Sequence, residues 1–381
     1  MRKILIFDSS VDGHRLEYIH HLYILAIANP EHEFYFLLPD DFDNVKTKLQ
    51  WKECPHIKIL YLTDRQKKNC NHHNLLKAAW YKSWAVRRTV KKYNIQYVWL
   101  ISLMLLMPFL AFLLPKGVKV SGVLYRLYFY EGTTIRGLRL LAEKIRYKLM
   151  VASRNVDRIL VLNDQWATEQ LNTHYRTDKF VYIPDPIPQT DKFSVVCIRE
   201  ELGAKSCDKV LLHFGALNRR KGTLEILEAI RMMKQEMLTD KIFVFAGKVN
   251  EDMKEEFYHL ISEAKAKCRI HVFDEFCPYS FLNNLCYSCD CILIPYKNPN
   301  QSSGVIGYAA RFRKPVIGPS QGLLGRLIKE YDLGETTADV NAVSLATLLG
   351  NMGSVNHCFG GYVESHSVEE FNRHFLCTNV H

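Results

Sequence analysis

Short apolar runs alternate with stretches of helical periodicity along the whole chain. Residues 4–7 form the first run, and a helical pattern over about 16–28 follows it. The runs are apolar at nearly every position, as expected for strands that are buried on both faces of a parallel sheet. In the first half this pattern predicts further strands at 34–38, 57–62, 97–102, 122–125, 159–162 and 180–183.

The second half repeats the alternation. Its predicted strands are 210–214, 242–246, 270–273, 291–295 and 315–317, and its predicted helices are 223–235, 253–267, 280–287, 305–312 and 323–331. Between the halves, residues 183–189 carry three prolines in five positions, which favours a stiff extended link. We therefore expect an α/β protein with a Rossmann-like domain at 1–188 and a second at 189–360. Ligands of such sheets bind at the carboxyl ends of the strands, so we expect the site in the cleft between the domains.

Composition supports this interpretation. The chain has 381 residues, of which 48% are hydrophobic and 24% charged, which is typical of a globular protein of about two domains. The net charge is +10, but residues 1–190 hold 28 basic and 17 acidic side chains, so the excess lies in the first half. A basic first half favours an anionic partner.

The first apolar run has four residues, too few for a signal peptide, and the eleven cysteines are then expected as reduced thiols in the cytoplasm. The apolar run 99–114 has 16 residues with Pro108 inside, whereas a membrane span needs about 20. It favours a buried strand, a loop and an apolar helix over membrane contact. Cys286, Cys289 and Cys291 resemble a metal cluster, but Cys291 opens an apolar strand, and we expect no metal there.

Two segments of the second half suit an anion. Gly215 follows a predicted strand, and Arg219, Arg220 and Lys221 then bring three cations to the start of a helix. A solvated basic turn is the alternative. The segment 295–304 enters the next helix, where Ser302 or Ser303 is expected to cap it and Gly304 allows a close approach. An ordinary capped helix without a ligand is the alternative there. Since both segments follow strands of one sheet, a diphosphate is the natural common partner.

These residues resemble the retaining glycosyltransferases of family 4 (group 1 type), which have the GT-B fold. The family's "strand-Gly-Arg…Lys-Gly-helix" signature is similar to 213–222, and its "Gly-Lys-Pro-Val-Ile" is similar to 313–317. The strand ending in Ala-Gly at 243–247 and the segment 289–295 also match, and together these pieces cover about 205–335. Residues 367–371 resemble the family's closing helix, so we expect residues 361–381 to form a helix that crosses back to the N-terminal domain.

The resemblance implies a hexosyltransferase of polysaccharide biosynthesis that uses a nucleotide-diphosphate sugar of the UDP or GDP type, keeps the anomeric configuration and needs no metal or other cofactor. Lys221 and Arg219 would neutralise the diphosphate and act in catalysis, although the family usually places its arginine where Ala216 stands. The donor would also contact Gly13, Gly215, Gln301 and Ser302, and the backbone of Ser303 and Gly304. Gly13 is otherwise a turn glycine, and His14, which follows it, is either an acceptor-side residue or a helix cap.

One departure from the family concerns its two glutamates. They are eight positions apart, and here they fall on Asn300 and Tyr308. Asn300 could hydrogen-bond a sugar hydroxyl and Tyr308 could bond or stack on the ribose. A lost carboxylate–hydroxyl bond weakens binding by roughly 1.5–3 kcal/mol. An inactive nucleotide-sugar-binding partner subunit is therefore an alternative function.

The acceptor, a glycan or lipid-linked glycan, is expected on the N-terminal domain. Residues 65–92 carry nine basic side chains, no acidic one and two tryptophans, which favours a helix on an anionic membrane surface, at the inner face of the membrane. The alternative is a solvated basic helix with its tryptophans in the core. The loop 128–136 offers Tyr130, Glu131 and Arg136 to a sugar, or is a plain helix start. A nucleic-acid-binding protein is a weaker alternative because no such motif is present, and we expect no nucleic-acid partner.

Overall fold

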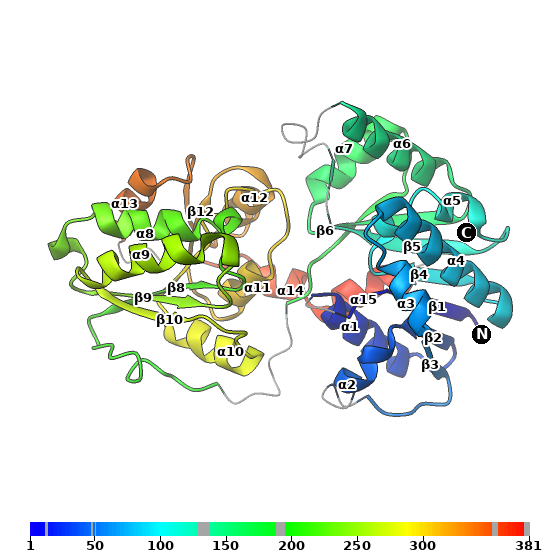
Figure 1. Ribbon diagram of the computed structural model, residues 1–381, viewed down its shortest axis with the longest axis horizontal. Coiled ribbons are helices and arrows are strands. Elements are labelled where there is room, and N and C mark those ends of the chain that lie inside the picture. Colours follow the sequence, from blue (N-terminus) through cyan, green and yellow to red (C-terminus); the bar gives the residue numbers. More distant parts are fainter. Residues whose placement is uncertain are drawn as a thin grey trace. The chain divides into compact units, whose positions relative to one another are not determined.

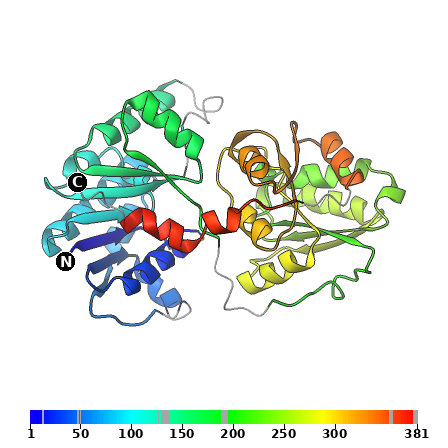
Figure 2. The same cartoon turned by 180° about the vertical axis from the view of Figure 1, so that it is seen from behind.

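The computed structural model divides into two compact units. One unit comprises Met1–Pro184 with Glu369–His381, and the other comprises Asp185–Val368. The structure describes the chain except for residues 12–13, 47–48, 50, 126, 129–136, 188–194, 353–356 and 377–381, and for His14 it describes the backbone alone. Each unit contains one sheet with helices on both faces (Figures 1 and 2).

In the described residues of the first unit, seven strands form a parallel sheet in the order β3-β2-β1-β4-β5-β6-β7. They are β1 (Lys3–Phe7), β2 (Glu33–Leu38), β3 (Ile57–Tyr61), β4 (Tyr97–Leu100), β5 (Lys119–Leu124), β6 (Val156–Leu162) and β7 (Phe180–Ile183). The helices are α1 (His14–Ala28), α2 (Asp43–Lys46), α3 (Asp64–Cys70), α4 (Leu75–Tyr93), α5 (Leu110–Leu113), α6 (Leu138–Ala152), α7 (Gln165–Tyr175) and α15 (Val368–Leu376).

The alternation of side chains along β1 separates two cores. Leu5 and Phe7 pack on one face with residues of α4, α6 and α7, whereas Ile4 and Ile6 pack on the other face with α1. The second face also receives α15, whose Phe371 and Phe375 are buried there. Phe371 stacks on Tyr18 of α1, with ring centroids 5.2 Å apart. A helix at the end of the chain thus completes the core of the first unit.

In the described residues of the second unit, six parallel strands follow the order β10-β9-β8-β11-β12-β13. They are β8 (Lys209–Phe214), β9 (Lys241–Ala246), β10 (Arg269–Phe273), β11 (Cys291–Leu293), β12 (Val316–Pro319) and β13 (Gly334–Thr337). The helices are α8 (Thr223–Met232), α9 (Lys254–Lys265), α10 (Tyr279–Ser288), α11 (Gly304–Arg311), α12 (Gly322–Glu330), α13 (Ala342–Gly350) and α14 (Tyr362–Ser365). Helices α8, α9 and α13 cover one face, and α10, α11 and α12 cover the other.

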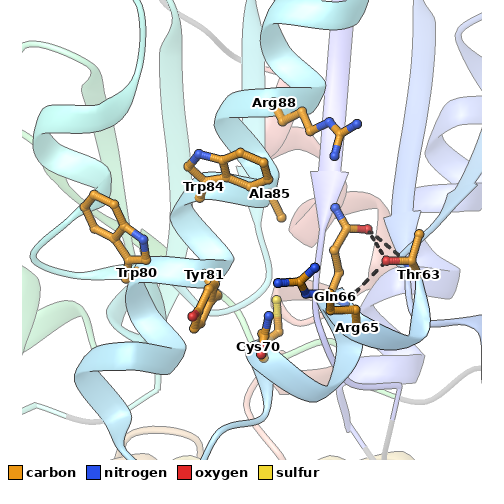
Figure 3. Close-up of a pocket in the computed structure, with 10 residues that line it drawn as sticks. Thr63, Arg65, Gln66, Cys70, Trp80, Tyr81, Trp84, Ala85 and Arg88 are labelled. Carbon is orange, nitrogen blue, oxygen red and sulfur yellow. Dashed lines mark hydrogen bonds between the residues drawn. The ribbon is translucent and has the colours of Figure 1, made fainter.

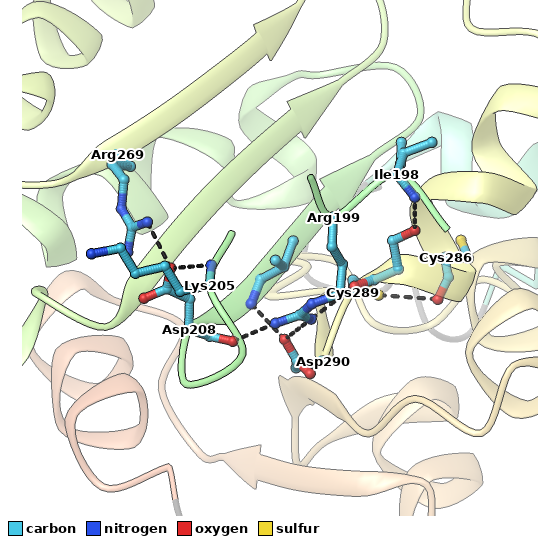
Figure 4. A network of polar contacts seen from close by, with 10 residues as sticks. Ile198, Arg199, Lys205, Asp208, Arg269, Cys286, Cys289 and Asp290 are labelled. Carbon is cyan, nitrogen blue, oxygen red and sulfur yellow. Dashed lines mark hydrogen bonds and ion pairs between the residues drawn. The ribbon is translucent and has the colours of Figure 1, made fainter. Parts of the chain in front are cut away.

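A polar network closes the amino-terminal edge of this second sheet (Figure 4). Asp208, just before β8, accepts a hydrogen bond of 2.7 Å from Arg269 at the start of β10. Arg199 donates to Asp290, just before β11, also at 2.7 Å. The Arg269 guanidinium and the backbone N–H of Lys205 hold the pKa of Asp208 at about 2.

Several sequence predictions need correction. The predicted apolar helix after strand 97–102 is a 3-10 turn (Leu103–Leu106) and the four-residue α5. Strand β13 and helix α13 were not predicted. The segment 65–92 forms two helices, α3 and α4, because Asn74 accepts hydrogen bonds from the N–H groups of Leu76 and Lys77 and begins a new helix. None of the helices in the described residues is both long and apolar enough to span a bilayer.

Candidate functional site

The turn that follows β8 is built around two glycines. Gly215 has φ +92° and Gly222 has φ +72°, where other residues are strained. A Cβ at Gly222 would overlap the carbonyl oxygen of Pro295, so this turn packs directly against the segment that follows β11. Between the glycines, Asn218 caps a short 3-10 turn (Arg219–Lys221) by accepting from the N–H of Lys221. The cations predicted to meet an anion lie in that turn.

Lys221 holds a nearly buried ammonium group. The residue is 9% exposed, and its Nζ donates to the carbonyl of Phe214 at 3.2 Å. The same Nζ lies 5.3 Å from the centre of the Tyr296 ring. Among the described residues no carboxylate lies within 4.0 Å of it. Because a buried cation without a counter-ion is unfavourable, this position is suited to an anionic ligand.

The two arginines beside Lys221 differ in their contacts. The guanidinium of Arg219 donates to Glu256 in the first turn of α9 at 2.7 Å, and it lies 3.8 Å from Asp252 in the 3-10 turn just before that helix. Arg220 lies 5.8 Å from the Tyr296 ring centre and has no carboxylate partner in the described part of the chain. The role predicted for Arg219 stays a prediction. Arg220 was predicted only as one of three cations and not as a catalytic residue, but within the described residues it is the arginine of this turn without a carboxylate partner.

His213 fixes the base of this turn. Its ring is fully buried, and burial lowers its pKa to about 4, so the ring is neutral at pH 7. A carbonyl only accepts, so Nδ1–H donates to Leu293 O at 2.8 Å, and Nε2 accepts from the hydroxyl of Thr223 at 3.0 Å. The histidine therefore connects β8, β11 and the first residue of α8. These contacts position the residues on either side of Lys221.

The segment 295–304 supplies the other side of the site. Tyr296 is buried beneath Lys221, and its hydroxyl lies 3.3 Å from Ser303 Oγ. The backbone N–H of Lys297 donates to Arg220 O at 2.9 Å. The two segments that were expected to share an anion are thus in direct contact. Tyr296 joins them, and its position after a strand is the only sequence feature that points to it.

The predicted capping of α11 is wrong. Ser303 is the N-cap residue, but its side chain makes no capping hydrogen bond, and Ser302 Oγ donates instead to Asp185 at 2.6 Å. In the described residues the N–H groups of Gly304 and Val305 have no hydrogen-bond acceptor. Uncapped N–H groups at a helix start favour an anion. The absence of a serine cap therefore leaves more donors for a ligand than the sequence pattern indicated.

The remaining predicted donor residues lie around this centre. Asn300 packs against Gly322 at the start of α12, because a Cβ there would come within 2.6 Å of Asn300 Oδ1. Gln301 is partly exposed beside it. Tyr308 is buried in the core, with its ring edge-to-face on Phe214 at 5.5 Å between centroids. The roles proposed for these three residues stay predictions.

Residues predicted on the first unit fall largely outside the described residues. This holds for Gly13, Tyr130, Glu131 and Arg136, and for the side chain of His14, whose backbone opens α1. Among the described residues of the first unit, Asp8 was missed, although it directly follows β1. Its carboxyl group is buried, accepts from Ser10 N–H at 3.0 Å and from Arg15 at 3.3 Å, and burial raises its pKa.

The second unit therefore brings together a candidate anion site at the carboxyl edge of its sheet. Lys221 and Arg220 provide positive charge, and Gly304 and Val305 provide N–H donors. An array of this kind is chemically suited to an oxyanion. Within the described residues, no cluster of three or more His, Cys, Asp or Glu side chains is arranged to hold a metal ion.

Comparison with known proteins finds similarity in structure but not in sequence. No protein-family profile matches the chain, and no curated protein matches it. WaaG, a glycosyltransferase involved in lipopolysaccharide biosynthesis, superimposes with a TM-score of 0.63 at 16% identity, over 100% of this chain and 96% of WaaG. HepE from Anabaena in complex with UDP-glucose gives 0.68 at 15% identity, over 98% of both chains. A glycosyltransferase from Rickettsia africae gives 0.62 at 15%, over 99% of both. The chain has the GT-B fold.

Proposed function

We propose that this protein is a glycosyltransferase that uses a nucleotide-diphosphate sugar. The observation that carries the proposal is the nearly buried Lys221 ammonium, which lacks a carboxylate partner among the described residues. It lies over the ring of Tyr296, whose hydroxyl contacts Ser303 at the uncapped start of α11. The GT-B fold, which HepE shares in its complex with UDP-glucose, supports a donor of this class. We take the donor to be of the UDP or GDP type and the sugar to be a hexose.

In the proposed reaction an acceptor hydroxyl attacks the anomeric carbon, and the bond from that carbon to the donor phosphate breaks. Negative charge then develops on the diphosphate, where Lys221 and Arg220 neutralise it and the α11 N–H groups donate to its oxygens. The acceptor proton passes to that phosphate, which balances the transfer. Retention of configuration, independence from metal and an acceptor that is a glycan or lipid-linked glycan belong to this proposal through the resemblance to family 4.

The test begins with thermal unfolding in the presence of UDP, GDP and their sugar conjugates. A ligand at 100 times its Kd adds about 2.7 kcal/mol, so the true donor class should raise Tm by a few degrees. Lys221→Ala should remove that rise and lower transfer by about 100-fold or more. Lys329→Ala, an exposed lysine at the end of α12, is the matched control. Unchanged transfer in Lys221→Ala would rule out the assignment.

An inactive nucleotide-sugar-binding partner subunit is the second candidate function. It is favoured by the replacement of the family's two glutamates by Asn300 and Tyr308, of which Tyr308 is buried against Phe214. Isotope-labelled donor separates the two functions. Donor binding without transfer or hydrolysis, with every acceptor class tried, would establish the partner subunit, whereas labelled product would establish the enzyme.

A further inference from the structure

The outer side of α3 and α4 combines aromatic and basic side chains at helical spacing. We call this surface the α3–α4 face and define it by Arg65, Lys77, Trp80, Tyr81, Trp84 and Arg88. Trp80 and Trp84 are each 43% exposed, although large aromatic side chains are usually more deeply buried. The opposite side of α4, with Ala78, Ala85 and Val86, is buried in the first unit. Both tryptophans therefore lie on the partly exposed side of α4 and outside the buried core cluster of the first unit, in contrast to the alternative in which they are core residues.

Two cavities adjoin on this face. One has a volume of about 390 Å³, and the other, of about 450 Å³, shares Asn69, Trp80 and Tyr81 with it. Figure 3 shows Trp80, Tyr81 and Trp84 along α4 on one side of the first cavity, with Thr63, Arg65 and Gln66 from the start of α3 on the other. The face is thus hollowed between aromatic rings and cations, with space for a small polar group.

The charges of the cavities are of one sign. Arg65 and Arg88 line the first cavity and Lys77 lines the second, while no Asp or Glu is among the lining residues that the structure describes. Arg88 lies 5.7 Å from the ring centre of Trp84. Lys67, by contrast, is paired with Asp40 and Asp41, so its charge is already neutralised. The cavities therefore favour an anionic group between the cations.

Apolar side chains surround these cations. Leu75, at the start of α4, is 73% exposed, and Leu76 and Phe112 are also mostly exposed. Phe112 belongs to α5, which packs against α4. A nucleic acid would meet the cations but would leave the leucines in water. A bilayer surface meets both, since indoles and apolar side chains enter the boundary region while cations contact lipid phosphates.

We propose that the α3–α4 face binds the surface of an anionic phospholipid bilayer, with a headgroup phosphate between Arg65 and Arg88. Trp80, Trp84 and Leu75 then enter the boundary between headgroups and acyl chains. This assignment rests on the first unit alone and is independent of the donor site. It would bring a lipid-linked acceptor to an enzyme that crosses no membrane with its described helices.

Co-sedimentation with vesicles tests the proposal on the full chain. Vesicles of phosphatidylcholine mixed with phosphatidylglycerol should bind the protein at about 0.1 M salt, and release it as salt is raised, because surface charges are then screened. Vesicles of phosphatidylcholine alone should bind far less. Each basic side chain near such a surface contributes about 1 kcal/mol, so Arg65→Gln with Arg88→Gln should weaken binding about 30-fold. Trp80→Ala with Trp84→Ala should weaken it by at least about tenfold.

Matched variants test whether binding requires this face or only any exposed lysines or any exposed tryptophan. Lys265→Gln with Lys329→Gln removes two exposed cations of the second unit, and Trp166→Ala removes a tryptophan of α7 that is 45% exposed. Both should bind like the wild type. The proposal is overturned if anionic vesicles do not bind, if both arginine substitutions leave binding unchanged, or if a labelled single-stranded DNA binds with the same salt and variant dependence while vesicles do not. Since no step uses a donor, failure here leaves the proposed transfer reaction unaffected.

Discussion

Two neighbouring arginines in the turn after β8 differ in whether their charge is paired with a carboxylate. Arg219 is paired with Glu256, whereas Arg220 stacks near Tyr296 without a carboxylate partner in the described residues. We expect Arg220→Ala to weaken binding of UDP or GDP by about 1.5–3 kcal/mol, or roughly 10- to 100-fold in Kd. Arg219→Ala should change Kd only a few-fold, since exposed ion pairs contribute little. Titration calorimetry measures both, and equal losses would contradict the distinction.

Substitution of Gly215 tests whether the conformation of the turn after β8 is needed for nucleotide binding. Its φ of +92° strains any other residue, and a Cβ there would overlap the Lys221 ammonium. Gly215→Ala should therefore destabilise the protein by about 1–2 kcal/mol and abolish the Tm rise with nucleotide. Gly203→Ala is the matched control, because Gly203 has φ +64° with no atom near its Cβ position. It should lose similar stability and keep the nucleotide response. Loss of the response in both variants would show that strain alone explains the effect.

Asp208 should make part of the free energy of unfolding depend on pH. Its folded pKa of about 2 lies below the usual 3.9, so the charged form favours the folded state above about pH 4. That contribution is lost as pH falls from about 4 through 2. Asp208→Asn should destabilise the protein by about 1–2 kcal/mol at pH 7, and by less near pH 3. Urea unfolding at both pH values measures this. A difference that does not shrink in acid would contradict it.

At the scale of elements, the sequence predicted those strands and helices whose positions are determined by burial of apolar side chains. The central strands of both sheets were predicted because their residues are apolar on both faces. Strand β13 was missed because it has the sequence Gly-Glu-Thr-Thr and is only half-buried at the edge of the sheet. The break between α3 and α4 depends on Asn74, which caps the start of α4. The basic residues on both sides of Asn74 were treated as one helix in the prediction from sequence, and so this break was missed.

The candidate site shows the same division. Its two segments were predicted because glycines, cations and serines follow strands of one sheet. Which arginine turns toward Tyr296 depends on Glu256, 37 positions away from Arg219, and no local pattern carries that information. The serine cap failed for a similar reason, since Ser302 bonds Asp185 across 117 positions. Contacts between distant segments decide these details.

Helix α15 allows a test of the division of the chain into two units, because it belongs to the first unit although it follows the second in the sequence. Phe371 is fully buried among residues of the first unit, although it follows the second unit in the sequence. Phe371→Ala should destabilise the first unit by about 3–5 kcal/mol. Hydrogen exchange should then lose protection in α1 and β1 but not in β8 and β9. Phe257→Ala, an equally buried residue of α9, should give the reverse pattern. Protection lost evenly in both units would contradict the division.

At the scale of the whole molecule, three buried histidines set a pH dependence. Burial lowers the pKa of His21, His213 and His366 to about 4. Below pH 6.5 the unfolded chain binds protons that the folded chain does not, so stability falls from about pH 6.5 to 4. Each histidine contributes up to about 1.4 kcal/mol per pH unit. Urea unfolding across this range should show the slope, and His366→Gln should reduce it. An unchanged slope in that variant would contradict the assignment.

The placement of α15 also affects the order in which the protein is made. Unit one contains the first and the last segments of the chain, and all 184 residues of Asp185–Val368 come between them. Ribosomes add about 5–20 residues per second, so roughly 10–40 s pass between the synthesis of residue 184 and that of α15. Until then Phe371 cannot cover the apolar surface beside Tyr18. During that interval the nascent chain exposes hydrophobic surface on β1 and α1. A chaperone that binds such surface should therefore associate with ribosome-bound chains that end before residue 369, and dissociate once α15 has emerged.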